Sequence, residues 1–362
     1  MRIGMVTIWF ERGQSYLSRT LRQAVLELGH EVYLFARTGG VYGQAMHERS
    51  GAWDMQPRFD HPTYEIAPGT LLSWARYHHL SAVIFNEEYA FDLPAACKQV
   101  GFKTIHYMDY VGQGWKPLLR HYDQLWSATW RTHDLLMSMQ VRSDAHFIGW
   151  GLLPGMLGNG SAAPTHDFFH NAGWLGINCR KGTDVLLQAC ALLAYAGRPV
   201  RALIHAQLPW EAARQVIGAG APLPLGVEWR HEMVPPPGLY HLGRICVQPS
   251  KLEGLGLTLV EAMAARRPLV TTDAPPMHEF VTPETGWLVP VKEWRPREDP
   301  IVFQEAHVSP EDLARTMVEA LQTPPDLLEQ KTQATLMRTR HLFDWEAFKG
   351  RIAEGIGRIG AT

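Results

Sequence analysis

The sequence predicts an α/β protein of two successive domains, each built around a parallel β-sheet. Three observations support this fold class. The chain has 362 residues, which is more than one domain of roughly 100–200 residues needs. Short apolar runs alternate with helical patterns in both halves, as is typical of parallel sheets. A stretch rich in Gly and Pro, residues 151–165, separates the two series.

The first domain opens with a strand–helix–strand unit. Ile3–Trp9 is a continuous apolar run of the kind that forms a buried parallel strand. Apolar residues then recur at helical spacing from Leu17 to Leu28, and Gly29 ends the pattern. Glu31–Ala36 is the second strand. Such a crossover joins strands that lie parallel in one sheet.

The rest of the first domain contains shorter strands. The four expected strands are Ala82–Phe85, Lys103–Met108, Gln124–Ala128 and His146–Gly149. Residues 39–73 are rich in Gly, Pro, His and Arg and show no clear period, so we expect long loops there, on one rim of the sheet.

The second domain repeats the alternation. We place the domains at residues 1–160 and 161–344, and expect the C-terminal helix, residues 345–362, to pack back on the first domain. The apolar face of that helix consists of Phe348, Ile352 and Ile356. The expected strands are 167–174, 201–206, 227–230, 245–248, 269–272 and 286–291. The expected helices are 183–196, 210–217, 258–265 and 310–321.

Composition excludes several classes of protein. The formal net charge of −2 gives no basic field for nucleic acid. Four scattered cysteines without C-x-x-C exclude a disulfide scaffold and a cysteine-rich zinc site, and favour a reducing compartment. The N-terminus runs straight into an expected strand, so we expect no signal peptide, and no apolar run of about 18 residues predicts a transmembrane segment. We expect a cytoplasmic protein, with peripheral contact to a membrane left open.

The most informative segment is Pro249–Glu261, which lies between an expected strand and an expected helix. Gly254 and Gly256 let a ligand approach the backbone, and the free N–H groups of a helix start favour phosphate. Glu253 and Glu261 would repel phosphate, but carboxylates accept hydrogen bonds from sugar hydroxyls. A nucleotide sugar, with a diphosphate between two sugar rings, fits this pattern. The alternative is a Thr-x-x-Glu capping box, in which Glu261 is purely structural.

A second candidate element is Cys179–Thr183, which also joins a strand to a helix. It places Arg180 and Lys181 beside a helix N-terminus, where cations are unfavourable unless an anion compensates them. The alternative is an ordinary solvated pair at the surface.

These residues resemble the donor-binding half of GT-B retaining glycosyltransferases, most nearly those of family 4 (glycosyltransferase group 1). Glu253 and Glu261 match the family's E-x7-E pattern, and Lys181-Gly182 matches its Lys-Gly pair. The similarity extends over residues 168–290 through Pro268-Leu-Val-Thr-Thr-Asp273 and Gly286-Trp-Leu-Val-Pro290. The N-terminal half resembles the family in outline, with Gly13 in an early loop. The implied fold is two Rossmann-like parallel-sheet domains that face each other across a cleft.

The resemblance implies roles for individual residues. Glu261 would hold the ribose hydroxyls, and Lys181 would neutralise the donor diphosphate. Gly13 would let the N-terminal loop approach the diphosphate. Glu253 would face the transferred sugar together with the backbone of four residues, Gly254, Leu255, Gly256 and Leu257.

Three departures from the family concern the same site. Trp174 stands where the family has an Arg that contacts phosphate, so Arg180 is the candidate substitute. Pro275-Pro276 replaces a Gly-Gly pair. Many members carry a His at the end of an N-terminal strand. His106 lies in such a strand, but Met108-Asp109 occupies its end. The implied catalytic residues are Glu253, Lys181 and His106.

The resulting hypothesis is a retaining glycosyltransferase that uses a nucleoside diphosphate sugar as co-substrate and has no cofactor. The acceptor, whether glycan, lipid or small molecule, is not identified. The sequence contains no Asp-x-Asp and no H-E-x-x-H, so we expect no metal. One alternative is a non-catalytic sugar-nucleotide-binding protein. A nicotinamide-dependent oxidoreductase is a further alternative, although the first strand–helix turn, Glu11–Gln14, lacks G-x-G-x-x-G.

Overall fold

The computed structural model describes residues 1–39, 48–153, 155–157, 163–176, 179–218 and 222–360. The chain divides into two compact units. Unit 1 comprises Met1–Leu153 with Phe343–Thr362, and unit 2 comprises Pro154–Leu342. The domain boundary expected between residues 160 and 161 lies outside the described residues.

Unit 1 is built around a seven-stranded sheet in the order β3-β2-β1-β4-β5-β6-β7, and every strand pair in it is parallel. The strands are β1 Arg2–Ile8, β2 Glu31–Arg37, β3 Arg58–Asp60, β4 Ala82–Asn86, β5 Lys103–Met108, β6 Gln124–Ser127 and β7 Asp144–Phe147. The helices are α1 Gly13–Glu27, α2 Pro68–Tyr77, α3 Asp92–Gln99, α4 Trp130–Ser138 and α11 Trp345–Gly360. The central strands are buried along their length, as their continuous apolar sequences predict.

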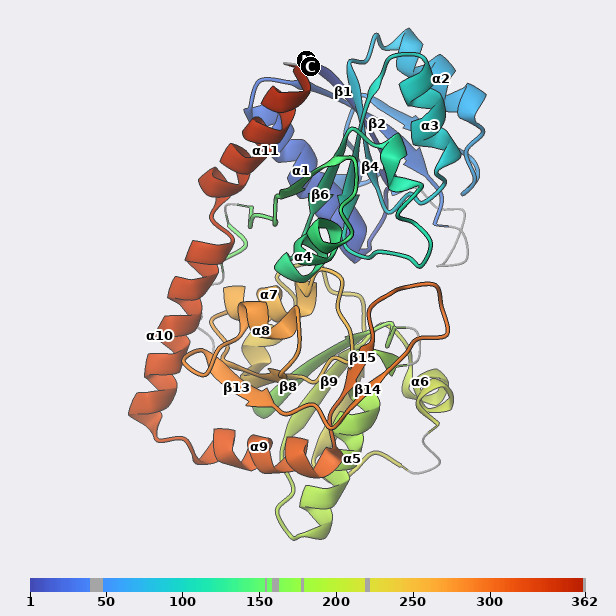
Figure 1. The fold of residues 1–362 in the computed structure, drawn as a ribbon. Coiled ribbons are helices and arrows are strands. Elements are labelled where there is room, and N and C mark those ends of the chain that lie inside the picture. The colour runs from blue at the N-terminus through green and yellow to red at the C-terminus, as the bar shows by residue number, and fades with distance from the viewer. Residues whose placement is uncertain (40–47, 154, 158–162, 177–178, 219–221, 361–362) are drawn as a thin grey trace. The chain divides into compact units, whose positions relative to one another are not determined.

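Helix α11 packs on unit 1 alongside α1 (Figure 1). Phe348, Ile352 and Ile356 form its buried face. Polar contacts fix its register: Glu27 Oε2 accepts from Trp345 Nε1 at 2.8 Å and pairs with Lys349 Nζ at 3.0 Å. The C-terminal helix therefore completes the core of unit 1.

Unit 2 contains a six-stranded parallel sheet in the order β10-β9-β8-β11-β12-β13. The strands are β8 His166–Gly173, β9 Ala202–Ala206, β10 Val227–His231, β11 Gly243–Gln248, β12 Leu269–Thr272 and β13 Gly286–Val289. The helices are α5 Thr183–Tyr195, α6 Trp210–Ile217, α7 Leu257–Ala264, α8 Met277–Phe280, α9 Pro310–Gln322 and α10 Pro325–Leu342. An antiparallel hairpin, β14 Glu293–Arg295 with β15 Glu305–His307, is added to this unit.

The expectation of long loops over residues 39–73 is wrong in part. The edge strand β3 and the start of α2 lie within this range. β3 has three residues, too few to show a period, and α2 begins with Pro68, whose fixed φ suits the first helical position. The expected α/β class with two parallel sheets is confirmed.

Candidate functional site

Two loops meet at the carboxyl edge of the unit 2 sheet. One follows β8 and the other follows β11, and between these neighbouring strands the strand order reverses. Ligands of open α/β sheets bind at such a reversal. The amide of Lys251 donates to the carbonyl of Arg180 at 2.8 Å, which joins the two loops. The site is therefore fixed by the sheet topology.

Glycines allow this close approach. Gly182 has φ +74° and precedes α5, and a Cβ there would lie 2.0 Å from the carbonyl oxygen of Pro249 in the other loop. Gly256 has φ +73° and precedes α7, and a Cβ there would lie 2.6 Å from the ring of Phe280. A larger residue at position 182 would push the two loops apart, and one at position 256 would displace the ring of Phe280 in α8.

Two cations converge on one buried carboxylate. Lys181 Nζ lies 2.8 Å from Oε1 of Glu253, and Arg180 Nη1 lies 3.2 Å from Oε2. Ser250 Oγ also donates to Oε1 at 2.7 Å. Burial raises the pKa of Glu253, but the two cations and these hydrogen bonds outweigh it and hold the pKa at about 2. The carboxylate is ionised, and it holds two cations side by side where an anionic ligand could contact them.

Lys181 links this cluster to the start of α7. Its ammonium also donates to Oγ1 of Thr258 at 3.3 Å. Burial lowers the pKa of Lys181, and the charge of Glu253 opposes this shift. Leu257 begins α7, so the free N–H groups of its first turn lie beside the cluster, with Gly254 and Leu255 in the loop before it. Cations and helix N–H groups together can hold a diphosphate.

Glu261 lies one turn into α7, and its carboxylate has a different partner. Tyr240, in the 3₁₀ turn Tyr240–Leu242, donates its hydroxyl to Oε2 at 2.5 Å. Burial raises the pKa of Glu261, while Tyr240 and Lys181 lower it. The capping-box alternative is wrong, because the residue that caps α7 is Gly256 and no side chain caps the helix. Glu261 is thus available for binding.

Two other expected site residues belong to unit 1. Gly13 is the first residue of α1. His106, on β5, is fully buried against the rings of Tyr122 and Tyr89, at 4.8 and 5.6 Å between centroids. Burial lowers the pKa of His106 to about 3, so its ring is neutral. Because this side chain is enclosed, we propose no contact between His106 and a substrate, and we leave His106 out of the proposed machinery.

Sequence reasoning missed a polar cluster at the carboxyl edge of the unit 1 sheet. Arg12 pairs with Glu87 at 3.0 Å, and Tyr89 donates to Oδ1 of Asp109 at 3.1 Å. Gln14 donates to the other oxygen of Asp109. Glu87 has φ +53°, and burial raises its pKa to about 7 with a contribution from Asp109. The available signal was the position of Glu87 and Asp109 within two residues of the ends of two expected strands.

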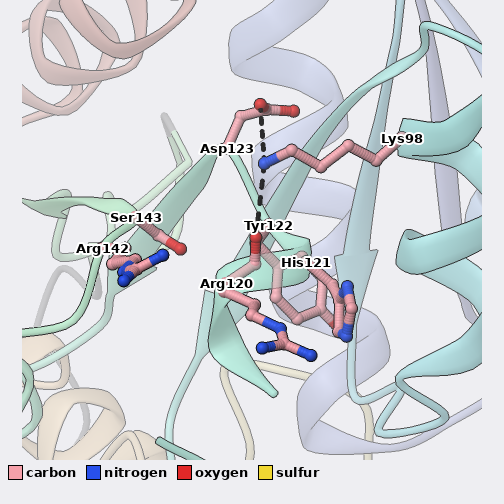
Figure 2. A pocket seen from close by; sticks show the side chains of 7 residues that line it. All are labelled: Lys98, Arg120, His121, Tyr122, Asp123, Arg142 and Ser143. Carbon is pink, nitrogen blue, oxygen red and sulfur yellow. Dashed lines mark hydrogen bonds and ion pairs between the residues drawn. The ribbon is translucent and has the colours of Figure 1, made fainter. Parts of the chain in front are cut away.

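A pocket of about 460 Å³ in unit 1 lies at the opposite edge. Figure 2 shows its lining, in which Lys98 pairs with Asp123 at 3.2 Å. Asp123 and Ser143 directly precede β6 and β7, so the pocket opens at the amino ends of the strands. Ligands of open α/β sheets bind outside the carboxyl ends of the strands instead. This pocket contains none of the expected site residues.

No group of three or more His, Cys, Asp or Glu side chains that could hold a metal ion occurs within the described ranges. Among the helices of the described part of the chain, none is long and apolar enough to cross a membrane.

A family model matches the segment that carries this site. Residues 170–322 match the family described as Glycosyl transferases group 1. Arg180, Lys181, Glu253 and Glu261 all lie within the match. No curated protein matches the sequence.

Solved structures match nearly the whole chain at low sequence identity. A sucrose-phosphate synthase from Thermosynechococcus elongatus is 17% identical, covers 99% of both chains and superposes with a TM-score of 0.70. A glycosyltransferase from Rickettsia africae is 14% identical, covers 99% of this chain and 98% of that chain, with a TM-score of 0.73. The Anabaena protein HepE in complex with UDP-glucose is 14% identical. The match covers 99% of this chain and 100% of that chain, with a TM-score of 0.73. These matches confirm the expected GT-B fold.

Proposed function

We propose, from the premise that this chain is a glycosyltransferase with a group 1 domain in a GT-B fold, that it moves a sugar from a nucleoside diphosphate to an acceptor hydroxyl or similar group. We further propose that the reaction retains the anomeric configuration and needs no metal. The observation that carries the proposal is the convergence of Lys181, Arg180 and Glu253 beside the start of α7.

The cations would act on the leaving group. When the bond between the anomeric carbon and the phosphate oxygen breaks, negative charge develops on the diphosphate. That charge would be stabilised by Lys181, Arg180 and the N–H groups of α7, which are already in position. Such preorganised groups are a major source of catalysis. They supply the positive charge that a divalent ion supplies in other sugar transferases, which is our reason for proposing metal independence.

The two glutamates would contact different parts of the rest of the donor. Glu261 would accept hydrogen bonds from the ribose, and Glu253, with the backbone of residues 254–257, would face the transferred sugar. Both oxygens of Glu253 contact cations. We therefore assign it a second role, which is to hold Lys181 and Arg180 in place until the donor arrives.

The first test is a thermal-shift panel with UDP-, GDP- and ADP-sugars, since a ligand selective for the folded state raises the melting temperature. HepE was solved with UDP and with UDP-glucose, so uridine donors come first. We expect one nucleotide class to stabilise the protein. If none does at millimolar concentration, the proposal is wrong.

Calorimetry with Glu261→Gln then tests the site. The amide keeps the size of the side chain but loses the charge, so nucleotide binding should weaken by about tenfold or more. Circular dichroism controls for folding. Unchanged affinity would show that the nucleotide binds elsewhere.

A non-catalytic sugar-nucleotide-binding protein is the alternative, and one observation favours it. Trp174, which is 59% exposed at the end of β8, provides no charge where the family has a cation. Release of free nucleoside diphosphate from the donor, by transfer or by slow hydrolysis, would exclude this alternative.

A further inference from the structure

The carboxylate of Glu261 is held from behind by a buried tyrosine. Tyr240 is 2% exposed, and its ring packs edge-on against Phe169 at 5.0 Å between centroids. Its hydroxyl lies 2.5 Å from Oε2 of Glu261. Because packing fixes the ring, the position of this oxygen of Glu261 is fixed as well.

A third residue determines the direction of that hydrogen bond. Asn171 Nδ2 lies 2.7 Å from the hydroxyl oxygen of Tyr240, and Oδ1 of Asn171 accepts from the amide of Gly173 at 3.1 Å. The amide of Gly173 can only donate, so the oxygen of Asn171 faces it and the NH₂ group faces Tyr240. The NH₂ group donates to the phenol, which leaves the phenol proton for Glu261.

The backbone supports this arrangement. The pairing of β8 with β9 is irregular between Asn171 and Gly173. A bulge of this kind re-aims a side chain at the end of a strand. Here it coincides with the residue that holds Tyr240. Asn171, Tyr240 and Glu261 form a chain of hydrogen bonds, which we call the relay. It starts from a bulged strand and ends on α7.

The other oxygen of Glu261 has no such partner. Oε2 accepts from Tyr240, whereas Oε1 makes no hydrogen bond to any residue that the structure describes. The side chain of Glu261 is partly exposed. Tyr240 anchors Oε2, and Oε1 remains able to accept hydrogen bonds from a ligand.

We propose that Tyr240 is a positioning residue for the donor nucleotide, and that the Asn171–Tyr240 relay presents Oε1 of Glu261 to the ribose hydroxyls. This inference rests on the proposed function. An anchored carboxylate loses little conformational freedom when a hydroxyl binds, so the hydrogen bond to that hydroxyl contributes more to the affinity. The protein should therefore distinguish ribonucleotides from deoxynucleotides, and the distinction should depend on Tyr240.

The test is a set of calorimetric titrations with UDP, 2′-deoxy-UDP and 3′-deoxy-UDP. The GDP or ADP series replaces them if the thermal-shift panel selects that base. Wild type should prefer UDP over at least one deoxy analogue by about tenfold or more, as expected for loss of a hydrogen bond to a charged group. Tyr240→Phe keeps the ring and removes the hydroxyl. It should lower affinity for UDP, leave affinity for that analogue nearly unchanged, and so reduce the preference by about fivefold or more.

Asn171→Asp is the second variant. It retains the acceptor for Gly173 but replaces the NH₂ donor by an acceptor oxygen, which draws the phenol proton away from Glu261. The preference for UDP should fall as it does in Tyr240→Phe, although the ring of Tyr240 is intact. Tyr195→Phe is the matched control, because Tyr195 is 95% exposed, and its preference should equal that of wild type.

Four outcomes would contradict the inference. Equal losses for UDP and for both analogues in both variants would show that Tyr240 only supports folding. A preference that neither variant changes would show that the relay has no role. A wild type that binds UDP without distinguishing the analogues would overturn this inference alone. A wild type that binds no nucleoside diphosphate would overturn the proposed function, and this inference with it.

Discussion

Lys181 and Glu253 form a buried ion pair, with Nζ 2.8 Å from Oε1 and side chains that are 12% and 3% exposed. The pair joins the loop after β8 to the loop after β11, and these loops come together only because β8 and β11 are neighbours. A buried charge without a partner is costly, so each residue keeps the other ionised. Under the proposed function, a diphosphate that enters the site would meet a cation already in position.

Lys181→Ala should lower kcat/KM by more than about tenfold, since a hydrogen bond from a cation to phosphate is worth roughly 1.5–3 kcal/mol. Steady-state kinetics with the donor selected by the thermal-shift panel measures this effect. Arg201→Ala is the control, because the side chain of Arg201 is 68% exposed and pairs with Asp167 in the same unit.

Arg180→Ala should cause a smaller loss than Lys181→Ala. The side chain of Arg180 is 26% exposed, and its contact to Glu253, at 3.2 Å, is longer. A severe effect of Arg180→Ala combined with a silent Lys181→Ala would exchange the two roles. If both variants are silent, the diphosphate is held elsewhere.

Transfer activity should survive chelation with EDTA, because Lys181 and Arg180 provide the positive charge at the leaving group. The measurement is the initial rate with and without EDTA after extensive dialysis. Loss of activity that Mg²⁺ or Mn²⁺ restores would overturn the metal-independent mechanism.

The sequence predicted the fold well where local pattern and burial agree. Strands such as β1 and β12 are buried on both faces, so their apolar runs are unbroken and easily recognised. β3 and the β14–β15 hairpin were missed because their strands have three residues each, too few to show alternation. The pairing of β3 also depends on β2, which lies more than 20 residues earlier in the chain.

The candidate site was predictable only in part. The spacing of Glu253 and Glu261 is a local signal, and so is the Lys-Gly pair. Tyr240 carries no such signal, because it reaches Glu261 through the packing of a 3₁₀ turn 21 residues earlier in the chain. The capping box was misleading because the left-handed conformation of Gly256 places the helix start before Thr258.

Glu87→Gln should change how stability depends on pH. Burial, opposed by Arg12, raises the pKa of Glu87 from 4.5 to about 7 in the folded protein. The folded state thus binds this proton more tightly than the unfolded state does. The stabilisation is complete below pH 4.5 and is lost as pH rises through 7, by up to about 3 kcal/mol. Urea unfolding at pH 5 and pH 8 should show that the variant gains stability relative to wild type as pH rises. Parallel changes in both proteins would contradict this prediction.

His106→Leu should retain activity, and its free energy of unfolding should fall less than that of wild type as pH is lowered. Burial lowers the pKa of His106 from 6.5 to about 3, and neither ring nitrogen has a hydrogen-bond partner in the described part of the chain. The stability contributed by this neutral ring is complete above pH 6.5 and is lost as pH falls toward 3. At pH 4 the unfolded state binds the proton and the folded state does not, which costs wild type about 3 kcal/mol that the variant does not lose.

His170, with a pKa lowered to about 4, retains part of the acid sensitivity in both proteins. Urea unfolding at pH 4 and pH 7 measures the difference, and initial rates at pH 7 measure activity. A folded variant without activity would return His106 to the catalytic residues, because a side chain that only fills the core has no effect on turnover once the core is intact.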